Sequence, residues 1–135
     1  MTIAPPPLEY LFTMTAATKV SGMIKGGPNG TRLVVDASSG TVEGPRLNGT
    51  IVGPGGDWVL LGADGAMTLD VRILIKTADG DVYMTYHGFG VNGDITTAPR
   101  FEASGEANSW LNTSVCVAKG ELIDGGVKYN VFRVG

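Results

Sequence analysis

The sequence predicts an all-β protein of about eight to nine antiparallel strands that form a closed or nearly closed β-barrel. Short runs of alternating apolar and polar residues recur along the chain, and no stretch shows a sustained helical period. Gly, Asp, Asn and Pro separate these runs, and the 21 glycines follow no repeat. A chain of 135 residues supplies one hydrophobic core, so residues 1–135 are interpreted as a single domain.

A barrel is favoured over a sandwich because closure removes strand edges that otherwise pair with other chains. A barrel of eight or more strands also has an interior wide enough for one small ligand. We therefore expect a barrel whose interior can bind a small molecule.

The expected elements follow the alternation in chain order. Residues 1–7 include three consecutive prolines and are expected to form a flexible N-terminal arm. Strands are expected at 8–15, 18–25, 31–37, 47–52, 58–61, 67–77, 81–89, 115–123 and 127–134. The predicted turns are Asn29-Gly30, Ser39-Gly40, Gly55-Gly56-Asp57, Asp64-Gly65, Asp79-Gly80 and Asp124-Gly125-Gly126. Residues 91–114 are expected to be irregular apart from a short strand at 100–103, and long ordered connections are often functional.

Composition and charge exclude several classes of function. The net charge of −3 and the scattered Lys and Arg residues argue against nucleic-acid binding. No segment approaches the roughly 20 apolar residues that span a bilayer, and residues 1–7 lack the basic and apolar regions of a secretory signal. We therefore expect a cytoplasmic protein without a membrane partner.

Metal and nucleotide cofactors are not expected either. The chain has one histidine and one cysteine, which argues against a structural zinc site. Cys116 lies between two valines and is interpreted as a buried thiol. The glycine pattern of residues 88–93 ends a strand and leads into no helix, so it is interpreted as a loop and not as a dinucleotide site.

Several short motifs together resemble one protein family. They are Gly44-Pro45-Arg46-Leu47-x-Gly49, Gly55-Gly56-Asp57-Trp58, Leu69-Asp70-Val71-Arg72, Asp79-Gly80, Trp110-Leu111-Asn112 and Tyr129-x-Val131. In this order they are similar to the family catalogued as domain of unknown function 3237, over nearly the whole chain. The resemblance implies a small antiparallel β-barrel and draws attention to Asp70 and Arg72, but it assigns no chemistry.

The central hairpin carries the candidate catalytic residues. If Asp79-Gly80 forms a two-residue turn, Arg72 lies opposite His87 and Asp70 lies opposite Phe89. Asp70, Arg72 and His87 then share one face, and directly opposed residues have Cβ atoms about 5 Å apart. An acid, a guanidinium and an imidazole at this spacing are suited to proton transfer beside an anion.

Two interpretations of this hairpin are open. Its other face carries an apolar strip, defined as Val71, Ile73, Ile75, Met84 and Tyr86. In one interpretation the apolar strip fills the barrel and the polar face is exposed to solvent. In the other, the polar face lines a cavity and the apolar strip packs against a second subunit, because a bare strip is a liability for a monomer. The second is preferred since Tyr83 and Phe89 share the polar face, and it predicts a homodimer.

The predicted function is a cofactor-independent acid–base enzyme, namely an isomerase, lyase or cyclase, acting on a small, partly apolar metabolite. Arg72 would hold an anionic or carbonyl group, and Asp70 or His87 would move the proton. Candidate substrate-binding residues are Trp58, Tyr83, Phe89, Trp110 and Asn112, although the two tryptophans also fit a role in the core. The alternative is a non-catalytic carrier for a hydrophobic or aromatic acid.

Overall fold

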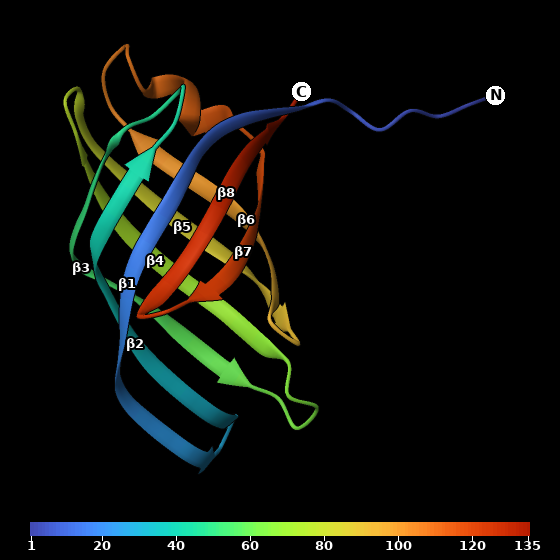
Figure 1. Cartoon of the computed structure of the whole chain (residues 1–135), viewed down its shortest axis with the longest axis vertical. Helices are drawn as coiled ribbons and strands as arrows, with labels where there is room; N and C mark the ends of the chain where they lie inside the picture. Colours follow the sequence, from blue (N-terminus) through green and yellow to red (C-terminus); the bar gives the residue numbers. More distant parts are fainter.

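Eight antiparallel strands form a closed barrel in the computed structural model, which describes residues 1–135 (Figure 1). Each strand pairs with its neighbours in the sequence, and β1 pairs with β8 to close the ring. The barrel prediction is therefore confirmed. The elements are β1 (Leu8–Gly27), β2 (Gly30–Glu43), β3 (Gly49–Leu61), β4 (Met67–Thr77), β5 (Gly80–Val91), β6 (Asp94–Ala103), the 3-10 helix η1 (Ser109–Thr113), β7 (Cys116–Ile123) and β8 (Gly126–Val134).

The strands β1, β2 and β3 are longer than the sequence predicts, because register shifts replace the predicted breaks. In β1 the ladder with β2 shifts between Ala17 and Lys19, so the separate strands predicted at 8–15 and 18–25 are wrong and form one strand. The ladder between β2 and β3 shifts between Asp36 and Gly40, and the ladder between β3 and β4 shifts between Val52 and Gly56. Such bulges take up extra residues without reversing the chain. The turns predicted at Ser39-Gly40 and at Gly55-Gly56-Asp57 are therefore wrong, and both segments lie inside strands.

Strand β6 occupies a segment that the sequence predicts to be mostly irregular. Its inward positions include Thr97 and Pro99 as well as Ile95 and Phe101, and all four are buried. A threonine and a proline interrupt the apolar alternation, which is why the pattern alone does not predict a strand of this length. No helix has the length and apolar character needed to cross a membrane.

The apolar strip of the central hairpin faces the interior of the barrel. Its five members are each at most 3% exposed. The interpretation that turns the strip outward is therefore wrong, because burying these side chains against one another already removes them from water. The predicted register is also wrong: Thr77 pairs with Gly80, so Asp70 lies opposite His87 and Arg72 lies opposite Thr85. The buried strip offers no surface for a second subunit, and the homodimer stays a prediction.

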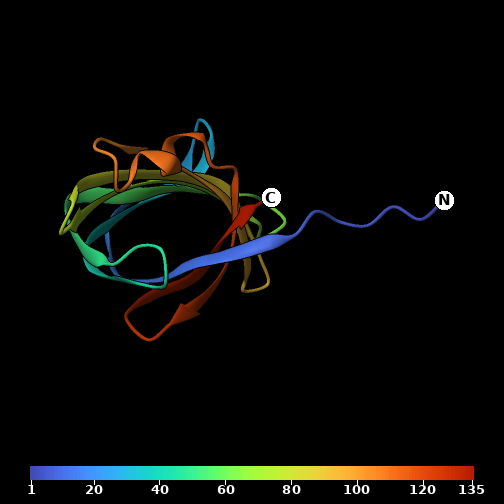
Figure 2. The same ribbon diagram turned by 90° about the horizontal axis from the view of Figure 1, so that it is seen from above.

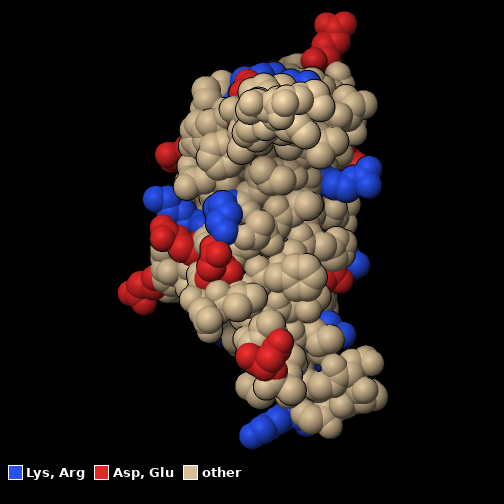
Figure 3. Space-filling model, turned by 90° about the vertical axis from the view of Figure 1, so that its right-hand side faces the viewer, with Lys and Arg blue, Asp and Glu red and all other residues tan.

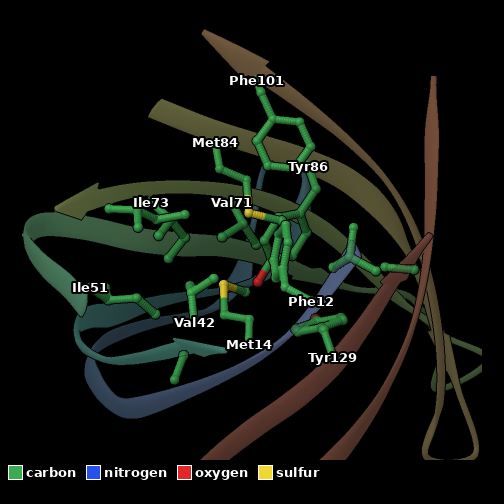
Figure 4. Close-up of a cluster of buried hydrophobic side chains, with 14 of the residues drawn as sticks. Phe12, Met14, Val42, Ile51, Val71, Ile73, Met84, Tyr86, Phe101 and Tyr129 are labelled. Carbon is green, nitrogen blue, oxygen red and sulfur yellow. The ribbon is translucent and has the colours of Figure 1, made fainter. Parts of the chain in front are cut away.

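The interior is packed in one half of the barrel only. Figure 4 shows Phe12, Met14, Val42, Ile73 and Met84 converging there, and each is at most 1% exposed. This half, next to η1 and the chain termini in Figure 1, is called the packed end. The other half, next to the β1–β2 hairpin, is called the open end.

The closing ladder between β1 and β8 requires a glycine at Gly126. A Cβ atom there would lie 2.0 Å from the carbonyl oxygen of Ala16, whereas a Cβ at Gly22 would meet no atom within 4 Å. We expect Gly126→Ala to lower the free energy of unfolding by about 1–3 kcal/mol through overpacking, and Gly22→Ala to change it by at most about 0.5 kcal/mol. Urea unfolding measures both. Equal losses of unfolding free energy in the two variants would show that the close approach of β1 and β8 at Gly126 does not limit stability.

Candidate functional site

An apolar cavity of about 310 Å³ lies inside the barrel towards the open end. Fourteen of its 16 lining residues are hydrophobic, with Val59, Leu69 and Val71 among them. Asp57 is the only charged residue in the lining, and the hydroxyl-bearing residues Tyr86 and Tyr129 face the same space. The cavity therefore combines an apolar wall with a small set of polar groups, as small-molecule sites usually do.

The cavity opens between the end of β1 and the β7–β8 hairpin. The pairing of β1 with β8 ends at Ala17 and Gly126, although β1 continues to Gly27. The β1–β2 hairpin accordingly extends beyond the β7–β8 turn in Figure 1. Val20 and Leu122 line the cavity from these two elements, yet they are 53% and 63% exposed. They therefore mark the mouth through which a ligand would enter.

Asp57 lies on β3 with its side chain directed into the barrel, in phase with the buried residues Ile51 and Val59. One carboxylate oxygen, Oδ1, accepts a hydrogen bond of 3.2 Å from the backbone N–H of Asp70. Burial raises the pKa of Asp57 from 3.8 to about 6; the N–H of Asp70 acts against this shift, and the charge of Asp70 adds to it. A carboxyl group with such a pKa can take up and release a proton near neutral pH.

Tyr86 from β5 and Tyr129 from β8 meet inside the barrel (Figure 4). Their ring centroids are 5.0 Å apart, with the rings inclined at 63°. Burial raises the pKa of Tyr129 to about 12, and burial followed by the influence of Tyr129 raises the pKa of Tyr86 well above its usual value. The negative charge of Asp57 raises both. The two phenols therefore stay protonated and can donate hydrogen bonds.

Gly120 makes room for one of these phenols. It lies opposite Tyr129 in the β7–β8 ladder, and a Cβ atom at this position would lie 2.4 Å from the tyrosine ring. Any side chain at position 120 would thus push the ring out of its place. The glycine contributes to the site by leaving space for Tyr129.

The predicted catalytic residues Asp70, Arg72 and His87 lie on the outer surface of the barrel. His87 Nε2 is 3.1 Å from Asp70 Oδ1, and the His87 side chain is 74% exposed. The guanidinium of Arg72 lies 5.1 Å from the ring of Trp58, also outside. The structure thus brings Asp70 and His87 together, but the interpretation that these residues line the cavity is wrong because the apolar strip occupies the interior. Their catalytic assignment stays a prediction.

Two further predicted substrate-binding residues, Tyr83 and Phe89, also point outward. Tyr83 and His87 line an open groove over β5 and β6 of about 390 Å³. Phe89 is 62% exposed. With Trp58, they belong to the outer face and not to the cavity.

Trp110 and Asn112 lie near the packed end and hold the structure together there. The guanidinium of Arg46 lies 3.9 Å from the centre of the Trp110 ring, and that of Arg133 lies 5.9 Å from it. Glu9 pairs with both arginines. Asn112 accepts a hydrogen bond of 2.7 Å from the backbone N–H of Ala103 and donates one of 2.8 Å to its carbonyl oxygen. Neither residue lines the cavity.

Sequence reasoning missed the carboxyl group and both phenol groups of the cavity. It placed Asp57 in a turn, Tyr86 in an outward strip and Tyr129 only within a family motif. The period-2 pattern held a usable signal, because Asp57 alternates in phase with Val59 on the same strand. A single acid among inward-facing apolar positions is the pattern that would have identified it.

Comparisons with known proteins agree on the fold. Residues 6–94 and 90–134 match the family described as "Protein of unknown function (DUF3237)". The chain is 28% identical over 108 residues to the hydroalkoxylation enzyme phnH of Penicillium herquei, which covers 80% of this chain and 70% of that protein.

Solved structures show the same architecture. A β-barrel-like protein from Acinetobacter baumannii AYE is 24% identical with a TM-score of 0.84, covering 99% of this chain and 100% of its own. A protein of unknown function from Rhodopseudomonas palustris is 21% identical with a TM-score of 0.90, covering 98% and 100%. An enzyme from Penicillium herquei is 22% identical with a TM-score of 0.81, covering 100% and 98%.

The raised pKa of Asp57 makes folding stability depend on pH. The folded-state pKa of about 6 lies above the ordinary value of 3.8, so the folded protein binds this proton more tightly than the unfolded chain. The free energy of unfolding therefore falls as pH rises from about 4 to about 6, by at most about 3 kcal/mol.

Asp57→Asn removes this loss and can still accept the hydrogen bond from Asp70. We expect the variant to gain stability relative to the parent between pH 4 and pH 7.5, as measured by urea unfolding at both pH values. Subtracting the free energy of unfolding of the parent from that of the variant at each pH removes the contribution of the other titrating groups. If the difference in the free energy of unfolding between variant and parent is the same at both pH values, the pKa of Asp57 is not raised in the folded protein.

Proposed function

Because the chain belongs to the DUF3237 family, whose description assigns no reaction, we propose its function from the cavity. The proposal is a cofactor-independent enzyme that adds a hydroxyl group across a carbon–carbon double bond within one apolar molecule. The observation that carries it is a carboxyl group of raised pKa facing two protonated phenols in an apolar cavity. The name of the relative phnH, a hydroalkoxylation enzyme, supports this reaction class.

Asp57 can supply both proton transfers that the addition requires. Its carboxylate takes the proton from the substrate hydroxyl, and the resulting carboxylic acid gives that proton to one carbon of the double bond while the oxygen bonds to the other carbon. The O–H bond and the π bond of the double bond break, one C–O and one C–H bond form, and no electrons are gained or lost overall. A pKa of about 6 lets one group do both near neutral pH.

Tyr86 and Tyr129 are suited to stabilise the oxygen while it carries negative charge. Because their pKa values are raised, they keep their protons and can donate hydrogen bonds to an oxyanion. Such donors act most strongly in a cavity that excludes water, and loss of one typically costs about 10²–10³ in kcat.

The size and lining of the cavity indicate the substrate. A volume of about 310 Å³ lies at the lower end of ligand sites, which span about 300–1,000 Å³. The lining is almost wholly apolar, so most of the substrate surface must also be apolar. An aromatic or terpenoid molecule with one hydroxyl group meets both requirements.

A carrier function is the second candidate, and the same lining favours it. Fourteen hydrophobic residues of 16 suffice to bind an apolar molecule, and Asp57 could then orient a bound hydroxyl group without reaction. The two functions differ in what the loss of Asp57 changes: turnover in an enzyme, and affinity alone in a carrier.

A paired set of variants tests the site. The substrates are ortho-prenylated phenols, whose ring hydroxyl can add to the side-chain double bond, and cyclised product is measured by liquid chromatography. We expect Asp57→Asn to lower kcat by about 10²–10⁴ while calorimetry still detects binding. We expect kcat/KM of the parent to rise with pH through about 6, because Asp57 must be ionised in the free enzyme.

Asp70→Asn and His87→Ala serve as the matched comparison on the outer face. Loss of turnover in these variants with Asp57→Asn unaffected would assign catalysis to the outer cluster and contradict the interior site. If the parent protein binds the ortho-prenylated phenols but converts none of these substrates to cyclised product, the carrier function is favoured.

The roles of the Tyr86 and Tyr129 hydroxyl groups are tested separately with Tyr129→Phe and Tyr86→Phe. Each substitution keeps the ring and removes one hydrogen-bond donor, so we expect kcat to fall about 10²-fold or more with little change in KM. Steady-state kinetics measures both parameters, and circular dichroism checks the fold. A rise in KM with unchanged kcat would show that the hydroxyl groups bind substrate without stabilising the transition state.

A further inference from the structure

Strand β6 has an edge without a neighbouring strand. It pairs with β5 along its whole length, from Asp94 to Ala103, but with β7 only through Ile95, Thr96 and Thr97. β7 begins at Cys116 and pairs there with β8. Residues 98–101 therefore border a groove of about 410 Å³, whose other side includes Val115 and Cys116. Unpaired strand edges are sites where a further strand can add.

The orientation of the backbone shows what this edge offers. Both the N–H and the carbonyl of Ala103 bond to the side chain of Asn112, which takes the place of a neighbouring strand at this one residue. Because polar groups alternate sides along a strand, the N–H and carbonyl of Phe101 and the carbonyl of Pro99 point the same way. They face the groove and are available to an extended segment.

Residues 1–7 form an extended arm whose one hydrogen bond to the barrel is at its base, Pro7. Every one of them is exposed, and Met1 and Ile3 are 115% and 84% exposed. Figures 1 and 2 show the arm leaving the barrel into solvent. Three consecutive prolines keep its inner part extended, since proline fixes φ and favours the polyproline II conformation.

The base of the arm lies beside the groove. The carbonyl of Pro7 accepts a hydrogen bond of 3.0 Å from the N–H of Gly135, and the N–H of Val134 donates one of 2.8 Å to the carbonyl of Val115. Val115 lines the groove and is 69% exposed. Figure 3, which views the side of the molecule at the right of Figure 1, shows scattered charges on a largely uncharged surface.

We propose that the arm of one molecule adds as a short strand to the β6 edge of a second copy, and that two copies exchange arms. The stiff prolines direct the arm away from its own barrel, so the acceptor is another molecule. Residues 2–4 carry the N–H groups that the prolines lack, and they match residues 99–101 in length, at about 10 Å each. Backbone bonds to Phe101 supply the pairing, and Ile3 packs against the exposed side chain of Val115.

The arm exchange stops at two copies, because each molecule has one arm and one groove and these lie next to each other. A two-fold axis lets both arms dock at once, which gives a dimer with no unpaired edge left for further copies. The homodimer expected from the sequence is thereby proposed again, on a different surface. This inference is independent of the proposed catalytic function.

Light scattering and native mass spectrometry of the full chain at micromolar concentration test the dimer. We expect the parent to be dimeric, and Ile3→Asp and Val115→Glu each to raise the dimer dissociation constant at least about tenfold. Val91→Asp is the matched control, because Val91 is a 50% exposed valine at the far end of β5. A monomeric parent, or a control as disruptive as the two variants, would overturn the proposal.

Crosslinking distinguishes exchange between copies from docking within one chain. Ile3→Cys and Val115→Cys are made as separate proteins, mixed and oxidised, and the linked peptides are identified by mass spectrometry. A disulfide between positions 3 and 115 of different molecules is the expected result. A second experiment oxidises the double variant Ile3→Cys/Val115→Cys. A disulfide between positions 3 and 115 within one monomer of the double variant, or no such disulfide in either experiment, would contradict arm exchange.

Discussion

The structure depends on how far β1 pairs with β8. Over residues 8–17 this pairing closes the ring, and side chains from all sides then fill the packed end. Past Ala17 the partner strand ends while β1 continues, so the wall opens beside Val20 and Leu122. One long strand with a shorter partner thus produces both a packed core and an accessible cavity in a domain of 135 residues.

The cavity places one carboxyl group where water is scarce, and this has an energetic cost. A buried carboxylate is disfavoured unless hydrogen bonds compensate, and Asp57 accepts one backbone bond from Asp70. The remaining penalty is what raises its pKa to about 6. Sites that tolerate such a penalty are frequently functional, because the same environment that destabilises the charge makes proton transfer efficient. The adjacent phenols keep their protons for the same reason.

The sequence predicts much of the fold and little of the site. Alternation and turn residues identify the strands, and Asn29 and Asp64-Gly65 do fall between strands. Period-2 alternation also shows that Val71 and Ile73 share a face, but it cannot say whether that face is inside. This depends on long-range contacts such as those of Met84 with the strands that surround it.

The errors about the site follow from that ambiguity. Asp70 and His87 are polar neighbours on one face, so they look like a site, whereas Asp57 stands alone among glycines and looks like a turn residue. What makes Asp57 a candidate is its burial, and burial is a property of the closed ring. The full length of strand β6 was not predicted for a local reason: Thr97 and Pro99 interrupt the apolar pattern at buried positions.

The hydrogen bond between Gly135 and Pro7 also has a kinetic meaning. It belongs to a seam that joins the two ends of the chain, so the barrel cannot close before its most distant segments meet. Contacts of large sequence separation carry the largest loop-closure entropy and are associated with slow folding. The other seven ladders join consecutive strands and can form locally. Ring closure is therefore the step that should govern the folding rate, and with it the time during which the strand edges of the open sheet are exposed to other chains.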